Sequence, residues 1–233
     1  MGKNLIQQAR GKGGPTYRSR SFRFAGRATF PKPIPAKGTV TDIIECPGHS
    51  APLIEVLYET GETCLMQAPT GIKKGDAVET GSTLPNIGNI LKLRDIPEGT
   101  NIYNIEKAPG DGGRFCRTSG TSAKIVGRTQ TEVIVLLPSK KEKTFNMDCR
   151  AAIGIISGGG RTEKPILKAG NVVHAMRARN KRYPNPSAAA QNAVDHPFGN
   201  KRTSRKAKQK AVNRFAPPGR KVGKLWPKRT GRR

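Results

Sequence analysis

The sequence predicts a mostly β protein made of two consecutive small β-barrels between long, irregular, basic extensions. The middle of the chain has strand-like apolar runs of about five to eight residues, separated by Gly or Pro every 8–12 residues. Both ends are rich in Lys, Arg, Gly and Pro and poor in aliphatic residues. A length of 233 residues is sufficient for two small domains.

The positive charge is concentrated at the two ends of the chain. The formal net charge is +27. Residues 1–35 contain eight Lys and Arg and no acid, residues 178–233 contain seventeen against one, and residues 36–177 contain eighteen against fifteen. The ends can bury little apolar area, so we expect them to become ordered only against a polyanionic partner. The alternative of purely solubilising tails does not explain their Pro, Gly and aromatic residues.

Residues 36–100 are expected to form the first barrel, of the oligonucleotide-binding type. Thr60-Gly61 lies between two apolar alternating runs and predicts a hairpin turn. Strands are expected at residues 39–46, 53–59 and 63–67, with a turn and a further strand start at 71–78.

Residues 101–177 repeat this pattern and predict the second barrel. A short helix is expected at 171–177, after a Gly at the end of the barrel. Strands are expected at residues 102–106, 123–128, 132–137, 143–147 and 149–156.

The two extensions, residues 1–35 and 178–233, are expected to be mainly irregular. A short helix is expected near residues 4–10, and Arg residues then alternate with Tyr17, Phe22 and Phe24. Cations interleaved with aromatic rings suit contact with phosphates and bases. In the last extension, Pro and Gly recur often enough to interrupt any long basic helix.

The four cysteines, Cys46, Cys64, Cys116 and Cys149, are expected to be buried, reduced thiols of a cytosolic protein. No two of them form a Cys-x-x-Cys pair, and no histidine has zinc-ligand spacing from them. We therefore expect no metal site. No apolar run approaches the 18 residues of a membrane-spanning helix, and the first residues do not resemble a signal peptide. Nucleic acid is therefore a better candidate than a membrane for the polyanionic partner.

The loop at residues 109–122 is the candidate binding element of the body. Its glycines permit close backbone approach, and Arg114 and Arg117 can pair with phosphates. The loop lacks the Gly-Lys-Ser/Thr ending of a nucleotide-binding P-loop. An RNA-contacting loop is favoured over a loop without a ligand and over a nucleotide-binding enzyme loop. The turn at Gly158-Gly159-Gly160-Arg161 is of the same kind.

Asp195-His196 suggests a catalytic alternative, with His196 as a general base. A carboxylate seldom reaches the imidazole of the next residue in the required geometry, and no nucleophile stands out in the sequence. We therefore expect a protein that is not an enzyme.

Several motifs resemble the universal family of large-subunit ribosomal protein two, in its archaeal or eukaryotic-like form. The resemblance covers nearly the whole chain. It is carried by Pro109-Gly110-Asp111-Gly112-Gly113-Arg114, Arg117-Thr118-Ser119-Gly120-Thr121, Asp148-Cys149-Arg150-Ala151, Asn192-Ala193-Val194-Asp195-His196-Pro197-Phe198-Gly199, Ala216-Pro217-Pro218-Gly219-Arg220-Lys221-Val222-Gly223 and Arg229-Thr230-Gly231-Arg232. The resemblance implies an oligonucleotide-binding barrel followed by an SH3-like barrel, with arms threaded into large-subunit RNA.

The chain departs from the family pattern on both sides of Asp195-His196. Gln191-Asn192-Ala193 stands where the family has Met-Asn-Pro, and Asn200-Lys201-Arg202 stands where it has a Gly run and a His-rich stretch. No histidine follows His196. A role for a histidine cluster therefore has no support in this chain.

Together these features predict a cytoplasmic structural constituent of the large ribosomal subunit. The resemblance implies roles in subunit assembly, in subunit association and in the RNA around the peptidyl-transferase centre. The implied partners are large-subunit ribosomal RNA, neighbouring ribosomal proteins, small-subunit RNA and tRNA, with no membrane and no cofactor. Two alternatives remain: direct participation of His196 in peptidyl transfer, and a free nucleic-acid-packaging protein. The residues expected to bind ribosomal RNA are Arg10, Arg18, Arg20, Arg23, Arg27, Arg114, Arg117, Arg150, Arg161, Lys181, Arg182, His196, Arg202, Arg220, Lys221 and Arg229.

Overall fold

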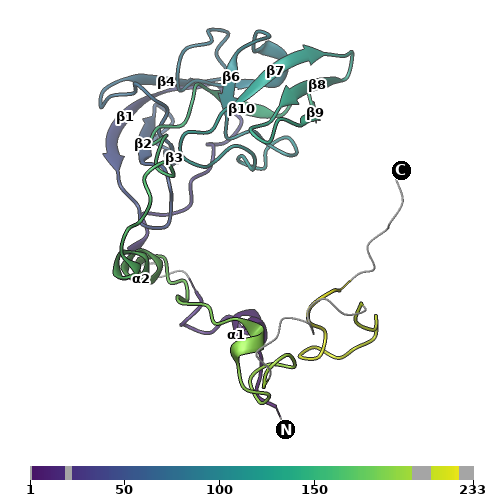
Figure 1. Ribbon diagram of the computed structural model, residues 1–233. Coiled ribbons are helices and arrows are strands. Elements are labelled where there is room, and N and C mark those ends of the chain that lie inside the picture. The colour runs from purple at the N-terminus through teal and green to yellow at the C-terminus, as the bar shows by residue number, and fades with distance from the viewer. Residues whose placement is uncertain (1, 19–22, 201–210, 226–233) are drawn as a thin grey trace. The chain divides into compact units, whose positions relative to one another are not determined.

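A computed structural model describes residues 2–18, 23–200 and 211–225 of the chain (Figure 1). Strands predominate, as expected, and the prediction of a mostly β protein is confirmed. The strands are β1 Ala36–Ile44, β2 Leu53–Tyr58, β3 Thr63–Gln67, β4 Ala77–Thr80, β5 Ile90–Lys92, β6 Asn101–Tyr103, β7 Ala123–Arg128, β8 Glu132–Leu136, β9 Glu142–Asn146 and β10 Arg150–Ile153. The helical segments are α1 Ile6–Gly11, η2 Leu93–Asp95, α2 Ala169–Ala178 and η3 Ala188–Ala190.

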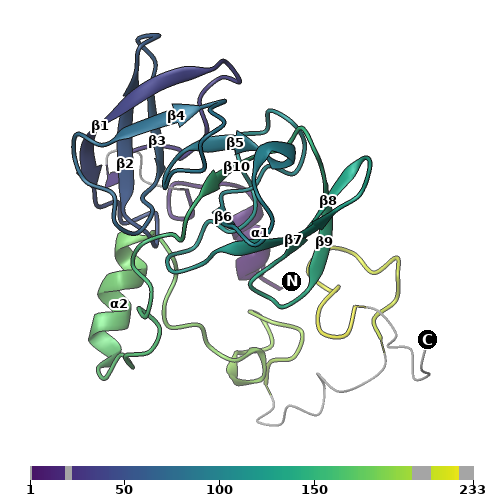
Figure 2. The same cartoon turned by 90° about the horizontal axis from the view of Figure 1, so that it is seen from above.

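All ten strands join one continuous sheet, in the order β3-β2-β1-β4-β5-β10-β6-β7-β8-β9. Figure 2 shows β1–β4 gathered at one end of this sheet and β7–β9 at the other, with β5 and β10 between them. All pairings are antiparallel except the contact between β4 and β5, which is parallel and joins Thr80 to Ile90.

The described residues form two large hydrophobic cores and a third, smaller cluster of Ala28, Cys46 and Leu53. One core contains Val40, Val56 and Met66 from the first strands, and the other contains Ile125, Val135 and Phe145 from the later strands. The central strands serve both, because alternate side chains of a strand point to opposite faces. Neighbouring residues therefore belong to different cores: Ile90 and Leu91 in β5, Tyr103 and Ile102 in β6, and Ala152 and Ala151 in β10.

The first hairpin forms where its turn sequence predicts. The Gly61 amide donates to the Tyr58 carbonyl over 2.8 Å, and Gly61 has a φ of +78°. A Cβ atom at Gly38 would lie 2.7 Å from the Tyr58 ring and from Val56, so only glycine fits there.

Most of the expected strands are observed, although β1 spans Ala36–Ile44 where 39–46 was expected and β4 begins only at Ala77, at the end of the range 71–78. Three further differences concern β6, β5 and β10. The start of β6 is as expected, but the chain leaves the strand at Tyr103 and does not continue to Glu106. The short strand β5 was not predicted from the sequence, because three residues do not establish an alternating pattern. The last strand, β10, occupies only the middle of the range expected from Cys149 onward.

The chain divides into two compact units. One comprises residues 20–167 and contains the whole sheet, and the other comprises residues 1–19 and 168–233, including α1 and α2. The assignment of residues 36–100 to an oligonucleotide-binding barrel and of 101–177 to an SH3-like barrel stays a prediction.

The four cysteines are free thiols, as expected, and Cys46 and Cys149 are buried. Cys64 and Cys116 are only half-buried. Burial raises the pKa of Cys64, Cys116 and Cys149 to about 11 in each case, and the neighbouring Glu62 adds to the rise at Cys64.

These raised pKa values predict thiols that react slowly in the native protein. At pH 8 the thiolate fraction of Cys64, Cys116 and Cys149 should be about a hundredfold below that of an unperturbed cysteine, because only the thiolate is nucleophilic. Alkylation by iodoacetamide, followed residue by residue by mass spectrometry, measures this directly. The guanidinium-unfolded chain is the control, and equal rates in the two states would contradict the prediction.

Candidate nucleic-acid interface

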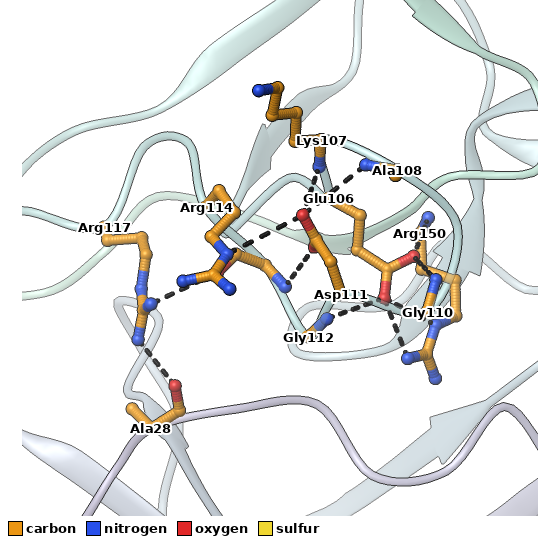
Figure 3. A network of polar contacts seen from close by, with 11 residues as sticks. Ala28, Glu106, Lys107, Ala108, Gly110, Asp111, Gly112, Arg114, Arg117 and Arg150 are labelled. Carbon is orange, nitrogen blue, oxygen red and sulfur yellow. Dashed lines mark hydrogen bonds and ion pairs between the residues drawn. The ribbon is translucent and has the colours of Figure 1, made fainter.

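Glu106 is a carboxylate enclosed within the sheet-containing unit. It follows β6, and its side chain is fully buried. Its Oε1 accepts hydrogen bonds from Arg150 Nη2 over 2.8 Å and from Nε over 3.2 Å (Figure 3). Its Oε2 accepts from the Arg150 backbone amide over 2.8 Å. This geometry pairs the two charges inside the protein.

The glycine-rich loop after Glu106 closes around the same carboxylate. The Gly110 and Gly112 amides donate to its two oxygens, each over 3.2 Å. Gly112 and Gly113 have φ values of +79° and +94°, which L side chains rarely adopt. A Cβ atom at Gly113 would also overlap the Asn104 side chain. The glycines therefore let the loop fold back onto Glu106.

Asp111 is a second carboxylate that shapes this loop. Its Oδ2 accepts from the Lys107 amide over 3.1 Å, and its Oδ1 accepts from the Gly113 amide over 3.0 Å. The guanidinium of Arg114 lies 3.7 Å from Asp111 Oδ2, with 52% of its side chain exposed. The loop thus holds Arg114 at the surface beside a single acid.

Arg150 is an internal anchor. Besides Glu106, its Nη1 donates to the Pro31 carbonyl over 2.9 Å, and its guanidinium lies 5.4 Å from the centre of the Phe30 ring. Only 8% of the side chain is exposed. The sequence placed Arg150 among the RNA-binding residues, but its donors face protein groups, so we do not carry it into the proposed interface.

Arg117 connects the loop to the segment that leaves the basic N-terminal extension. Its Nη2 donates to the Ala28 carbonyl over 2.5 Å, and its Nη1 donates to the Gly113 carbonyl over 3.1 Å. The pKa of Arg117 is lowered, first by burial and then by the positive charges of Arg114 and Arg27. The positive charges of Arg27 and Arg114 therefore act on Arg117, and an anion bound near them would offset this repulsion.

The second glycine-rich turn packs against the end of this loop. A Cβ atom at Gly120 would lie 2.6 Å from the Gly159 Cα, so the two backbones touch. Arg161 Nε donates to Ser119 Oγ over 3.0 Å, and Arg161 remains exposed. Close backbone approach thus brings Arg161 beside the loop that carries Arg117.

The remaining predicted cations fall into two groups. Arg20, Arg202 and Arg229 lie outside the described residues. The others are exposed: Arg23 and Arg27 in the sheet-containing unit, and Arg10, Arg18, Lys181, Arg182, Arg220 and Lys221 in the unit built from the chain ends.

His196 is held in a tight turn of the terminal unit. Its Nδ1 accepts from the Phe198 amide over 3.0 Å, and its backbone amide donates to the Asn192 carbonyl over 3.1 Å. A neutral imidazole that accepts at Nδ1 carries its proton on Nε2. Partial burial lowers the pKa of His196 below its ordinary value of 6.5, which favours this neutral form.

Asp195 does not orient the His196 ring. Its carboxylate lies 3.8 Å from the ammonium of Lys3, and within the described residues no hydrogen bond joins it to His196. The catalytic pairing considered from the sequence is therefore not formed. The described residues also contain no cluster of His, Cys, Asp and Glu that could hold a metal ion.

Comparison with known proteins identifies the family. A family model described as "Ribosomal Proteins L2, C-terminal domain" matches residues 86–216. The protein "Large ribosomal subunit protein uL2" of Methanobrevibacter smithii is 46% identical over 238 residues, which cover 99% of each chain. The protein of the same name from Nanoarchaeum equitans is 47% identical over 237 residues, which cover 100% of this chain and 99% of that protein. The chain belongs to the uL2 family of ribosomal proteins.

The resemblance inferred from the sequence is therefore confirmed. The matched region contains the whole Glu106 network except the Phe30 segment, and it contains the His196 turn. None of the helices in the described ranges is long and apolar enough to cross a membrane.

Two residues that organise this uL2 site were not singled out from the sequence. Glu106 was assigned only to a strand, and Phe30 only to the first extension. A signal for Glu106 was available, because a lone carboxylate ends an apolar run and precedes a loop rich in glycine amides. Phe30 has no comparable signal, since its contact with Arg150 spans 120 residues of sequence.

Removing one partner of the buried Glu106–Arg150 pair is expected to lower the stability of the protein strongly. Glu106→Gln leaves the Arg150 charge enclosed without a counter-charge, and we expect about 3–5 kcal/mol of destabilisation. Urea unfolding followed by far-ultraviolet circular dichroism measures it. Asp148→Asn is the matched control, because Asp148 pairs with Lys92 at an exposed site and should contribute less than about 1 kcal/mol. Equal effects of the two substitutions would contradict the prediction.

Proposed function

We propose that this chain is a structural constituent of the large ribosomal subunit that binds ribosomal RNA. The observation that carries the proposal is that Arg27 and Arg114 are exposed beside Arg117, whose pKa is lowered first by burial and then by the positive charges of Arg114 and Arg27. Its relatives are named as large ribosomal subunit proteins, which supports the same assignment.

The loop acts as a rigid carrier for these cations. Glu106 and Asp111 accept backbone hydrogen bonds within the loop, so most of the acidic charge near it is directed inward. Arg27 and Arg114 remain exposed, and guanidinium groups bind phosphate oxygens in a bidentate manner. Because the loop backbone is already held by these hydrogen bonds, little backbone freedom is lost on binding, which favours affinity.

The basic extensions supply further phosphate contacts on this proposal. Each phosphate that a Lys or Arg neutralises releases about 0.7–0.9 of a counterion, so affinity falls steeply with salt. We further propose that the chain supports the assembly and association of the subunits and the RNA around the peptidyl-transferase centre. Neighbouring ribosomal proteins, small-subunit RNA and tRNA are its further partners, and the ribosome in the cytoplasm is its location.

The proposal predicts that binding of RNA weakens steeply with salt and that individual arginines contribute to this dependence. Arg27→Ala and Arg114→Ala should each weaken binding of the full chain to large-subunit RNA and reduce the slope of log K against log salt by about 1. Filter binding over a salt series measures both quantities. Lys74→Ala is the control, since Lys74 is also an exposed cation but lies in the turn before β4, and no hydrogen bond or ion pair joins it to the loop within the described residues. A flat salt dependence of the unmodified chain would refute the electrostatic proposal.

Co-sedimentation separates this function from that of a free nucleic-acid-packaging protein. A ribosomal constituent should travel with the large subunit in a sucrose gradient after a gentle salt wash and be released by ribonuclease. A packaging protein should instead be found with bulk nucleic acid.

His196 is proposed to position RNA and not to catalyse a step. Its ring is fixed through Nδ1, which leaves an Nε2–H donor for an RNA acceptor. We predict that His196→Ala ribosomes that assemble normally form peptide bonds at an unchanged rate, measured with a puromycin-type reaction. Abolished peptide-bond formation in such ribosomes would restore the catalytic alternative.

A further inference from the structure

The two ends of the chain fold against each other within the terminal unit. The Lys3 amide donates to the Val194 carbonyl over 2.8 Å, and the Lys3 ammonium lies 3.8 Å from Asp195. Farther along, Asn180 Nδ2 donates to the Pro15 carbonyl over 3.2 Å. The N-terminal extension was expected to order only on a partner, yet here it has a protein surface to lie on.

A groove of about 520 Å³ opens between these two ends. Its volume falls within the range of small-molecule binding sites. Both ends contribute to its walls, so neither extension forms it alone. The polar and aromatic side chains that line it are Lys3, Asn4, Tyr17, Arg182, Gln191, Asn192 and the acid Asp195.

These side chains form the set that recognises an unpaired nucleotide. Tyr17 is half-buried and offers an aromatic face, and Arg10 lies 5.9 Å from the centre of its ring. Stacking on aromatic rings is how proteins hold unpaired RNA bases, and amide side chains such as Asn4 and Gln191 can hydrogen-bond to base edges. Lys3 and Arg182 are cations that can take the phosphate.

Charge argues that the occupant is an anion. Asp195 is the sole acid in residues 1–19 and 168–233, and it already faces Lys3. Among the described residues no acid pairs with Arg182, the second cation of the groove, so a cationic or neutral peptide would leave Arg182 without a counter-charge. A phosphodiester linked to a planar base satisfies both the cations and the aromatic wall.

We propose that this groove binds one unpaired nucleotide of an RNA strand, with its base against Tyr17 and its phosphate facing Lys3 and Arg182. The inference rests on the proposed RNA-binding function and specifies a subsite within it. It assigns the two extensions a joint role: together they select an unstacked base, in addition to neutralising phosphates.

The test compares a base-bearing with an abasic strand. The full chain is titrated with an oligouridylate of about ten nucleotides and with the abasic phosphodiester of the same length, at low salt. Tyr17→Ala should weaken binding of the oligouridylate about tenfold or more and leave binding of the abasic strand within about twofold. Tyr17→Phe should preserve binding of both, because the ring is retained.

Two further measurements keep the outcome decisive. Phe215→Ala is the matched control, since Phe215 is an exposed aromatic of the same unit that lines neither this groove nor the adjoining pocket formed by Tyr17, Arg182 and Tyr183. Limited trypsin cleavage at Arg10 and Lys12 reports whether each variant keeps the N-terminal segment docked. If trypsin cleaves Tyr17→Ala at these sites faster than the unmodified chain, Gln191→Ala tests the groove in its place, with the same preference for the base-bearing strand.

Several results would overturn the inference. Equal losses for the base-bearing and abasic strands, or an equal effect of Phe215→Ala, would show that the groove does not hold a base. Competition by polyglutamate as strong as that by oligouridylate would indicate a site for an acidic polypeptide. In each case a persisting salt dependence on large-subunit RNA would leave the proposed function standing, so the two failures are distinguishable.

Discussion

The buried ion pair between Glu106 and Arg150 is the constraint on which the candidate interface depends. A charge removed from water is tolerated only when it is paired and its remaining hydrogen-bonding positions are filled. The Glu106 oxygens meet this condition through Arg150 and the amides of Gly110 and Gly112. Any other path of the loop would leave part of a buried carboxylate unsatisfied, so the pair selects one conformation.

The same pair fixes the point at which the basic extension joins the folded body. Arg150 donates to the Pro31 carbonyl and lies over Phe30, while Arg117 donates to the Ala28 carbonyl. Arg27 directly precedes this tethered segment. Arg150 and Arg117 thus bind carbonyl groups of this segment, while the preceding Arg27 is exposed to solvent. The stability of the protein is thereby linked to the proposed binding of RNA.

The central strands explain how two cores can lie so close to this site. Because β5, β6 and β10 send alternate residues into different cores, shifting any of them by one residue would exchange the two sets of side chains. Arg150 begins β10 and Glu106 follows β6 by three residues. The register of the sheet therefore sets the distance between the two charges.

Four features could be predicted from the amino-acid sequence: the strand-rich body, the Thr60-Gly61 turn, the uneven distribution of charge and the family resemblance. Each depends on local patterns: alternation of apolar residues, glycine at turns, and the composition of a segment. The different roles of Arg150 and Arg114 became visible only in the folded structure. Both are arginines beside polar motifs, but Arg150 is paired with Glu106, which lies 44 residues away in the sequence. The folded structure also brought Lys3 to Asp195 across nearly the whole chain. Burial and long-range pairing depend on how distant segments pack, and no local pattern encodes them.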